Sequence, residues 1–204
     1  MGLAIALPTL HYLIFSTNKI KNMPKLIILD RDGVINYDSD EYIKSPEEWK
    51  AIPGSLEAIA RLNQAGYRVI LITNQSGLAR GLFSLETLHK IHNKMHKQLS
   101  EVGGNIEVTL FCPHGPKDHC NCRKPLPGLF HEFANRLAIS LTNVPAVGDS
   151  LRDLQAAGAA GAQPILVLTG KGNRTVNNKP GFEDIPVYKN LAAFVDDFLD
   201  TEKK

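Results

Sequence analysis

The chain has 204 residues, of which 43% are hydrophobic and 22% charged, and its formal net charge is +2 at pH 7. This length suits one domain with a full hydrophobic core, and the composition is that of an ordinary globular protein. A near-neutral chain without a basic stripe gives no case for binding nucleic acid or an anionic membrane surface, so we expect neither as a partner.

The first twenty-two residues differ in character from the rest of the chain. The apolar run Leu3–Phe15 is interrupted by Pro8 and His11, has no Lys or Arg before it, and is too short to span a bilayer. We therefore interpret residues 1–22 as a poorly ordered extension or a start assigned too far upstream, with a membrane-surface anchor as the alternative. Residues 23–204 then form the single functional domain.

Short apolar runs alternate with helical patterns from Lys25 onward, which indicates an α/β fold with a doubly wound, Rossmann-like parallel sheet. We predict strands over residues 25–29, 67–72, 106–111, 144–147 and 164–168. We predict a helix from 53–54 to about 66 and others over 84–102, 127–138, 151–160 and 191–199, with a glycine- and asparagine-rich loop over 170–181. The apolar stripe of the longest helix consists of Leu85, Leu88, Ile91, Met95, Leu99 and Val102.

Four polar motifs each follow a predicted strand, and the first is Asp30-Arg31-Asp32-Gly33. In a parallel sheet with right-handed crossovers, the carboxyl ends of the strands lie along one edge, where ligands bind. Two carboxylates two residues apart suit a nucleophile and a general acid/base, and Gly33 permits a sharp turn towards a ligand. Taken alone, the motif could equally be an Asx turn or a cap at the end of a strand.

The second and third motifs offer groups that bind phosphate. Thr73-Asn74-Gln75-Ser76-Gly77 provides hydroxyl, amide and backbone N–H donors, although a cluster of helix N-caps is the alternative. In Arg123-Lys124-Pro125, the lysine could neutralise charge on a transferring phosphoryl group, and Arg123 could grip a second anionic group. Two solvated surface cations would be the simpler interpretation.

The fourth motif, Gly148-Asp149-Ser150, has a further carboxylate at Asp153. Asp149 would supply a carboxylate for Mg²⁺, which binds few protein oxygens and keeps water and phosphate oxygens as ligands. We expect Asp153, one helical turn later, to support that site from behind, although acidic residues also favour helix N-termini for electrostatic reasons. A structural explanation accounts poorly for four such motifs in order, so we predict one phosphate-handling site.

These four motifs resemble those of the haloacid dehalogenase superfamily, and from Lys25 onward the chain resembles its histidinol-phosphatase and heptose-bisphosphatase branch. The resemblance implies little or no cap domain, with Asp30 as nucleophile, Asp32 as proton donor and base, and Thr73 and Lys124 as phosphoryl stabilisers. It implies that Mg²⁺ is held by Asp30, Asp149 and the backbone carbonyl of Asp32. The implied substrate-binding residues are Asp38, Tyr42, Thr73, Asn74, Gln75, Ser76, Arg123 and Lys124. Val34 and Ser150 depart from residues common in relatives, but neither departure removes a group that the chemistry needs.

The three cysteines of the chain lie within eleven residues, close to a histidine. An odd, clustered set is a poor disulfide framework, whereas three thiolates and an imidazole suit a closed, tetrahedral Zn²⁺ site. We predict that this structural site consists of Cys112, His114, Cys120 and Cys122, and we interpret His119 as a solvated neighbour; buried thiols beside a surface histidine are the alternative. Thiolate ligands require a reducing compartment, which favours the cytosol. His89, His92 and His96 are interpreted as flanking the apolar stripe of the long helix rather than as metal ligands.

The expected function is a Mg²⁺-dependent phosphatase that acts on a small sugar phosphate. Within the resembled branch, Ala79-Arg80-Gly81 favours removal of the 7-phosphate of a heptose 1,7-bisphosphate, and histidinol phosphate is the alternative substrate. A protein of a different class, a zinc module that binds nucleic acid or protein, is disfavoured by the near-neutral charge and the intact acidic motifs. We expect the enzyme to be a monomer.

Overall fold

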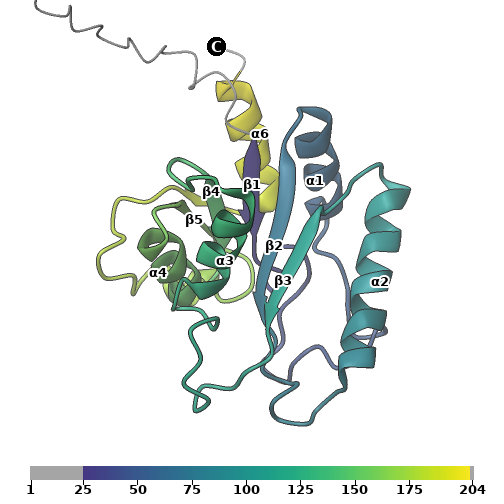
Figure 1. The fold of residues 1–204 in the computed structure, drawn as a ribbon. Coiled ribbons are helices and arrows are strands. Elements are labelled where there is room, and N and C mark those ends of the chain that lie inside the picture. The colour runs from purple at the N-terminus through teal and green to yellow at the C-terminus, as the bar shows by residue number, and fades with distance from the viewer. Residues whose placement is uncertain (1–24, 203–204) are drawn as a thin grey trace, which may run out of the picture.

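The carboxyl ends of all the strands in the sheet point to the same edge, because every neighbouring pair of strands is parallel. The structure is a computed structural model that describes residues 25–202. The interpretation of residues 1–22 as an extension therefore lies outside the described residues. Figure 1 shows the sheet with its helices and the cysteine loop that leaves β3.

The described chain alternates strands and helices. The strands are β1 (Leu26–Leu29), β2 (Arg68–Asn74), β3 (Val108–Cys112), β4 (Pro145–Gly148), β5 (Gln163–Val167) and β6 (Val187–Tyr188). The helices are α1 (Ser55–Gln64), α2 (Leu85–Glu101), α3 (Gly128–Leu137), α4 (Leu151–Ala159), α5 (Gly172–Thr175) and α6 (Leu191–Thr201). This confirms the predicted α/β fold with a doubly wound parallel sheet.

The order of the strands places the site. The order is β3-β2-β1-β4-β5-β6. From β1 the chain adds β2 and β3 on one side, and it then crosses to the other side of β1 to add β4, β5 and β6. β1 and β4 are hydrogen-bonded neighbours, with Leu29 opposite Val147. The helices that follow these two strands lie on opposite faces, so a crevice opens at their carboxyl ends, where ligands bind in sheets of this kind.

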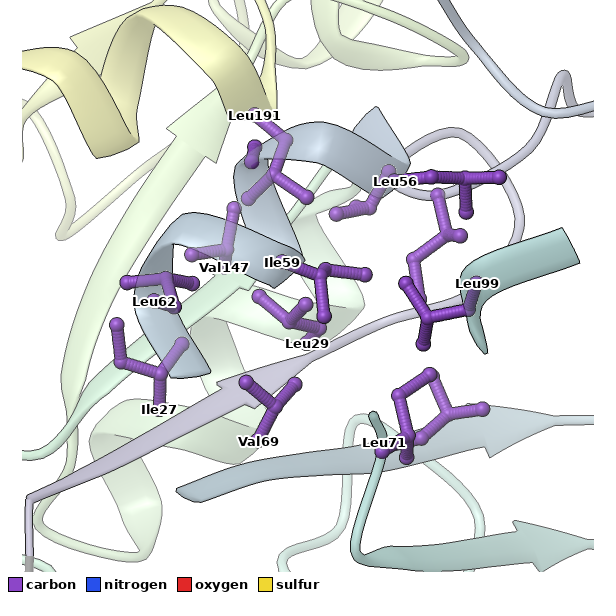
Figure 2. Close-up of a cluster of buried hydrophobic side chains, with 14 of the residues drawn as sticks. Ile27, Leu29, Leu56, Ile59, Leu62, Val69, Leu71, Leu99, Val147 and Leu191 are labelled. Carbon is purple, nitrogen blue, oxygen red and sulfur yellow. The ribbon is translucent and has the colours of Figure 1, made fainter. Parts of the chain in front are cut away.

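The core consists of two layers, one on each face of the sheet, and the side chains of β1 contribute to them alternately because successive side chains of a strand point to opposite faces. Ile27 and Leu29 belong to the layer formed with α1, α2 and α6, and Figure 2 shows the α1 side chains Ile59 and Leu62 in that layer. Leu26 and Ile28 belong to the layer formed with α3 and α4. Burial on both faces explains why β1 is apolar at every position, and it leaves Asp30 to emerge from the core at the edge of the sheet.

The structure corrects parts of the predicted secondary structure. The long helix begins as expected, since Ser84 Oγ accepts a hydrogen bond from the Thr87 backbone N–H at 3.1 Å. Its apolar stripe is shorter than predicted: Leu85 is 49% exposed and Val102 36% exposed, because they lie at the ends of α2, beyond the sheet. The predicted loop over 170–181 contains α5, and β6 was missed. A one-turn helix and a two-residue strand are too short to produce a periodic pattern.

The connections at the site edge carry no inserted domain within residues 25–202; apart from α5, their only regular structure is isolated bridges. Among these residues there is also no helix long and apolar enough to cross a membrane. The cavity at the carboxyl edge is therefore bounded by loops of this same domain.

Candidate active site

A cavity of ≈ 330 Å³ opens at the carboxyl ends of β1, β2 and β4. It brings together residues from every predicted motif. Of the residues predicted for catalysis, magnesium or substrate, those that line it are Asp30, Asp32, Asp38, Tyr42, Thr73, Asn74, Gln75, Ser76, Arg123, Lys124 and Asp149. They converge because each follows a strand or a strand-end loop that opens on the same edge.

Lys124 is the charged centre of the cavity floor. Its side chain is 4% exposed, and its Nζ lies 3.0 Å from Asp30 Oδ1 and 2.6 Å from Asp153 Oδ1. Nζ also donates to the backbone carbonyl of Ile72 at 2.8 Å. Burial alone would lower the pKa of Lys124, but Asp153 and Asp30 raise it, so the ammonium stays charged. Lys124 is thus a buried, fixed cation beside Asp30 and not the solvated surface cation of the simpler interpretation.

Asp153 bonds directly to Lys124 in addition to stabilising the start of α4, whereas we expected it only to support the metal site indirectly. It caps α4, since its Oδ2 accepts hydrogen bonds from the backbone N–H of Ser150 at 3.0 Å and from its hydroxyl at 2.5 Å. Its other carboxylate oxygen holds Lys124. Burial would raise the pKa of Asp153, but Lys124 and Ser150 lower it, so the group is ionised. The N-terminus of α4 therefore fixes the carboxylate that orients the lysine.

Three carboxylates form a group that could hold a metal ion. Single oxygens of Asp30, Asp149 and Asp153 all lie within 4.8 Å of one another. Burial raises the pKa of Asp30 to about 6 in spite of Lys124 beside it. Burial, with Asp153 and Asp30 as neighbours, raises the pKa of Asp149 to about 8. Crowded, desolvated carboxylates need more positive charge than one lysine provides, and hard oxygen ligands of this kind suit Mg²⁺.

Gly33 allows Asp149 to approach the Asp30 motif closely. Its φ is +82°, and a Cβ at this position would lie 2.0 Å from Asp149 Oδ2. Any side chain here would therefore collide with the carboxylate and strain the backbone. The glycine predicted to turn the chain towards a ligand also makes room for an acidic side chain from the neighbouring strand.

Asp32 lies outside the group of three carboxylates and is held by three side chains. Arg31 Nη2 lies 3.0 Å from its Oδ1, Asn36 Nδ2 donates to the same oxygen at 2.8 Å, and Gln75 Nε2 donates to Oδ2 at 3.0 Å. Burial would raise the pKa of Asp32, but these partners together lower it. The carboxylate is therefore ionised and fixed in orientation before substrate arrives.

Arg31 extends this network into the core and corrects the interpretation of one histidine. Arg31 is 1% exposed, and its Nη1 lies 3.3 Å from Nε2 of His92. His92 is 7% exposed and faces inward, so it does not merely flank the apolar stripe of α2. Burial, together with the Arg31 cation, lowers the pKa of His92 to about 3, so its neutral ring can accept from the guanidinium.

The side chains of the Thr73-to-Ser76 motif are buried or partly buried and largely engaged with other site residues. Gln75 Nε2 donates to Thr73 Oγ1 at 3.1 Å as well as to Asp32. Asn74 bonds to the main chain of Lys124 in both directions, through Nδ2 to the carbonyl and through Oδ1 from the N–H, each at 3.1 Å. Asn74 thus fixes the backbone of Lys124. The sequence motif at the end of β2 did not predict this contact.

Besides Arg31, three arginines line the cavity: Arg80, Arg123 and Arg152. Arg123 Nη1 donates to the backbone carbonyl of His114 at 3.1 Å, which ties it to the cysteine loop. Burial and the nearby Arg152 lower the pKa of Arg123. The guanidinium of Arg80 lies 5.7 Å from the centre of the Tyr42 ring. Sequence reasoning assigned Arg123 and Tyr42 to the site and used Arg80 only within the Ala79-Arg80-Gly81 segment that favoured a heptose substrate. It missed Arg152, because a single arginine in the first turn of a helix carries no motif.

The cysteine loop brings four potential metal ligands together. The Sγ of Cys112 lies 3.7 Å from that of Cys120 and 3.2 Å from that of Cys122, and His114 Nδ1 lies 3.2 Å from Cys122 Sγ. Tetrahedral Zn²⁺ with ordinary bond lengths separates such atoms by about 3.5–3.8 Å. All three cysteines are free of disulfides. The donor set and its clustering therefore suit one closed tetrahedral site, in which the two 3.2 Å separations would widen slightly, with His119 outside the cluster.

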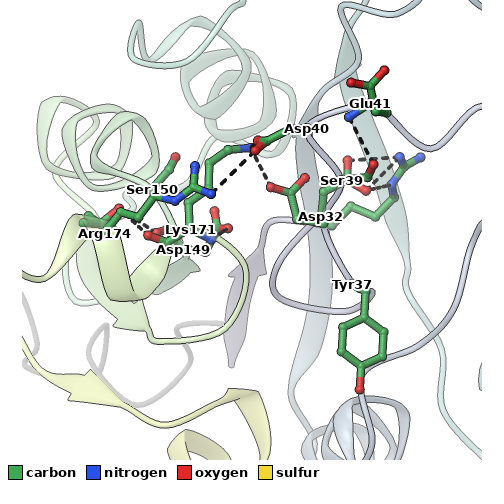
Figure 3. Close-up of polar contacts among 12 residues, drawn as sticks. Asp32, Tyr37, Ser39, Asp40, Glu41, Asp149, Ser150, Lys171 and Arg174 are labelled. Carbon is green, nitrogen blue, oxygen red and sulfur yellow. Dashed lines mark hydrogen bonds and ion pairs between the residues drawn. The ribbon is translucent and has the colours of Figure 1, made fainter.

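Sequence reasoning missed the segment that closes the cavity on the β5 side. Lys171 lines the cavity, its backbone N–H donates to Asp149 Oδ2 at 2.7 Å, and its Nζ lies 2.5 Å from Asp38 Oδ2. Figure 3 shows Lys171 and Arg174 beside Asp40 and Asp149. The only available signal was a glycine-rich stretch after a strand, which we interpreted as a plain loop.

Comparison with known proteins agrees with this geometry. Residues 27–107 match the family model described as haloacid dehalogenase-like hydrolase, and residues 121–194 match a HAD-hydrolase-like model. The D-glycero-beta-D-manno-heptose-1,7-bisphosphate 7-phosphatase of Bordetella bronchiseptica is 57% identical over 175 residues, which are 86% of this chain and 98% of that protein. The protein of the same name from Pseudomonas putida is 51% identical over 175 residues, 86% of this chain and 99% of its own length.

A solved structure is similar over the same extent. The crystal structure of the D,D-heptose 1,7-bisphosphate phosphatase from B. bronchiseptica, in complex with magnesium and phosphate, aligns with a TM-score of 0.85 and 56% sequence identity. The alignment covers 87% of this chain and 99% of that one. The chain therefore belongs to the haloacid dehalogenase-like hydrolases, in the family of these heptose bisphosphate phosphatases.

Proposed function

We propose that this protein is a Mg²⁺-dependent phosphatase that removes the 7-phosphate of D-glycero-D-manno-heptose 1,7-bisphosphate and leaves heptose 1-phosphate. The observation that carries the proposal is Asp30 held beside the buried Lys124 and next to Asp149, in a chain more than half identical to an enzyme of that name. The names of the relatives specify the β anomer, and we propose the same here. The product would serve as a precursor of nucleotide-activated heptose and lipopolysaccharide.

In the proposed reaction, Asp30 attacks phosphorus and forms a phospho-aspartate, which water then hydrolyses. Lys124 and Thr73 face the phosphoryl oxygens and stabilise the charge they carry. Asp32 is ionised in the free protein, so it must take up a proton as the phosphate dianion binds beside it, because a nearby negative charge raises the pKa of a carboxyl group. It then protonates the leaving oxygen and afterwards accepts the proton of the attacking water.

We assign Mg²⁺ to the carboxylates of Asp30 and Asp149 and to the backbone carbonyl of Asp32. When bound, the ion supplies positive charge that offsets the repulsion between the carboxylates and the phosphate. The side chain of Asp32 is occupied by its three partners and lies outside the group of three carboxylates, which is consistent with coordination through its main chain.

We assign Zn²⁺ to Cys112, His114, Cys120 and Cys122 as a structural ion. Four protein ligands leave no open position for catalysis. The carbonyl of His114, a zinc ligand in this assignment, accepts the hydrogen bond from Arg123. The site would therefore hold the loop so that Arg123 faces the cavity. Thiolate ligands need a reducing environment, so we place the enzyme in the cytoplasm.

The cations of the cavity support a substrate with two phosphates. Lys124 is already shared between two carboxylates at the catalytic end. Arg80 and Arg152 have no carboxylate partner among the described residues, and Arg123 bonds only to a carbonyl there. A second phosphate would supply the negative charge that these guanidiniums lack. We propose no nucleic acid or membrane partner, and a monomeric enzyme.

A phosphate-release assay with purified protein tests the substrate. The panel is D-glycero-D-manno-heptose 1,7-bisphosphate, histidinol phosphate and fructose 1,6-bisphosphate, each at several Mg²⁺ concentrations. We expect kcat/KM to be highest for the heptose bisphosphate by at least about tenfold, because histidinol phosphate lacks a second phosphate and fructose 1,6-bisphosphate spaces its two phosphates differently. Higher kcat/KM for histidinol phosphate would contradict the proposal and favour the alternative within the same branch.

A further inference from the structure

Residues 169–175, which follow β5, wrap around the ends of β1 and β4. Thr169 Oγ1 donates to the carbonyl of Gly33 at 2.6 Å, and Thr175 Oγ1 donates to the carbonyl of Asp149 at 2.9 Å. Between them, the backbone N–H of Lys171 donates to Asp149 Oδ2 at 2.7 Å. The segment therefore contacts both the main chain and the carboxylate of the residue assigned to Mg²⁺.

Gly170 shows how little freedom this segment has. Its φ is +56°, and a Cβ there would lie 2.1 Å from Asp149 Oδ2 and 2.6 Å from the Cα of Gly33. The backbone is therefore packed directly against the carboxylate, with no space for a side chain. Since the next residue is Lys171, the position of its Cα relative to Asp149 is fixed by the fold and does not depend on its side chain.

The side chain of Lys171 reaches the opposite wall of the cavity. Its Nζ lies 2.5 Å from Asp38 Oδ2 and 3.8 Å from Asp40, and both side chains of the closer pair are largely covered, at 32% and 16% exposed. Burial would lower the pKa of Lys171, but Asp38 raises it, so the ion pair is charged. Arg174 reaches Asp40 at 3.5 Å, but these side chains are 75% and 66% exposed, so this second contact is weak.

The wall that Lys171 reaches has space behind it. Asp38, Ser39, Tyr42 and Ile43 line the active-site cavity on one side and a second cavity of ≈ 440 Å³ on the other. Ile43 is buried in the core, but residues 37–42 before it are exposed or only partly buried, so few packing contacts fix their position. Among the described residues, the Lys171–Asp38 ion pair is the closest charged contact between this wall and the segment after β5. Figure 3 shows Lys171 and Arg174 of that segment beside Asp40 of the wall.

We propose that Lys171 is a positioning residue that joins the two halves of the active site. Its backbone N–H orients Asp149, and its side chain holds residues 38–43 in place through Asp38. The wall formed by residues 38–43 therefore keeps a fixed distance from Asp149, the proposed metal ligand. The substrate part of this inference rests on the proposed function, whereas the mechanical part concerns the free protein. Lys171 itself acts through Asp38 and Asp149 and does not take part in the chemical step.

Kinetics of Lys171→Met test the substrate part. Methionine keeps the backbone N–H and an unbranched chain but removes the cation. We expect KM for the heptose bisphosphate to rise about tenfold, the loss expected from a partly buried ion pair, with kcat changed less than about threefold. The Mg²⁺ concentration for half-maximal activity should stay within about twofold, because the N–H to Asp149 remains. Arg174→Gln is the matched control and should change KM less than about twofold, and Lys171→Arg should restore most of the loss.

Amide hydrogen exchange of the metal-free, substrate-free protein tests whether Lys171 holds residues 38–43 in place. The result does not depend on which substrate the enzyme uses. In Lys171→Met, amides of residues 38–43 should exchange at least about fivefold faster, whereas those of residues 169–175 should not change. Asp38→Asn should have the same effect, and the double variant should exchange no faster than either single variant. Unchanged exchange in residues 38–43, or additive effects of the two substitutions on KM, would overturn the proposal and indicate that Lys171 grips the substrate directly.

Discussion

One buried ammonium serves two carboxylates at the centre of this site. Lys124 Nζ lies 3.0 Å from Asp30 and 2.6 Å from Asp153, so Asp30 shares its neutralising charge with a residue that also caps a helix. Removing one member of a buried ionic group leaves the others uncompensated, which is costly. The proposed nucleophile, Asp30, is therefore best tested by a change that preserves its shape and removes only its charge and reactivity.

Asp30→Asn should abolish turnover and leave the fold intact, because an amide cannot attack phosphorus and the side-chain volume is retained. Phosphate release should fall to background, and beryllofluoride, which mimics a phospho-aspartate, should bind the wild-type protein only. Circular dichroism and thermal unfolding would verify the fold of the variant. Appreciable turnover by purified Asp30→Asn protein would rule out the covalent mechanism.

In the proposed function, Arg123 is the residue on which the preference for a bisphosphate depends. Its guanidinium bonds to the His114 carbonyl and leaves other N–H groups for a bidentate contact. Arg123→Ala should lose about 30- to 1,000-fold in kcat/KM on the heptose bisphosphate, roughly 2–4 kcal/mol, and far less on a heptose monophosphate without the C1 phosphate. Lys124→Ala is the comparison and should impair both substrates alike. Equal losses for both substrates in Arg123→Ala would place Arg123 at the phosphate being cleaved.

The raised pKa values of the acidic residues predict how magnesium binding depends on pH. In the metal-free protein, burial raises the pKa of Asp149 to about 8 and that of Asp30 to about 6. Both groups bind protons more tightly when folded, so a cation must displace those protons, and its apparent affinity should rise with pH up to about 8. Calorimetry should show Mg²⁺ affinity at least about tenfold higher at about pH 8.5 than at about pH 6.5, with proton release at the lower pH. An affinity independent of pH would show that Asp149 is already ionised without metal.

At the scale of elements, the connection from β3 to α3 runs over residues 113–127 at the site edge without a helix or strand. Cys112 ends β3, so one ligand of the proposed zinc site belongs to the sheet while Cys120 and Cys122 belong to the loop. The backbone N–H of Gly128, the first residue of α3, donates to the Asn121 carbonyl at 3.1 Å. A metal at this point would therefore link the strand, the loop and the following helix.

Zinc should be stoichiometric, with no role in the chemical step. Elemental analysis of protein made without a His tag should give about one Zn²⁺ per chain. Complete chelation should lower the thermal midpoint by several degrees and raise KM more than it lowers kcat, because the loop carries Arg123. Cys120→Ser should reproduce both effects, and His119→Ala is the matched control that should not. Full activity and unchanged stability after chelation would contradict a closed structural site.

The long elements were predictable from the sequence, and the short ones were not. The strand ending at Leu29 and the helix beginning at Leu85 follow from an apolar run and from Ser84 as a cap. By contrast, α5 and β6 are held by tertiary contacts, such as the hydrogen bond from Thr175 to the Asp149 carbonyl. Such contacts join residues far apart in the chain and produce no local pattern.

At the scale of the whole molecule, the topology accounts for what could be predicted of the site. Asp30 and Asp149 follow the two strands between which the direction of sheet growth reverses, so the order of the strands alone brings them together. Contacts between side chains from different elements were not predictable, because they depend on where the loops and helices lie. Examples are Arg31 with His92, Asn74 with the Lys124 main chain, and Lys171 with Asp38. Sequence reasoning thus predicted which polar residues meet in the cavity and missed much of what holds them in place.

The most direct test of the whole account is to follow one reaction by ³¹P nuclear magnetic resonance. Purified wild-type protein with Mg²⁺ is given D-glycero-β-D-manno-heptose 1,7-bisphosphate, and Asp30→Asn protein is the control. We expect the 7-phosphate resonance to be replaced by inorganic phosphate while the 1-phosphate resonance persists, with no change in the control. Loss of the 1-phosphate resonance, or no reaction under conditions in which histidinol phosphate is hydrolysed, would contradict the proposed function.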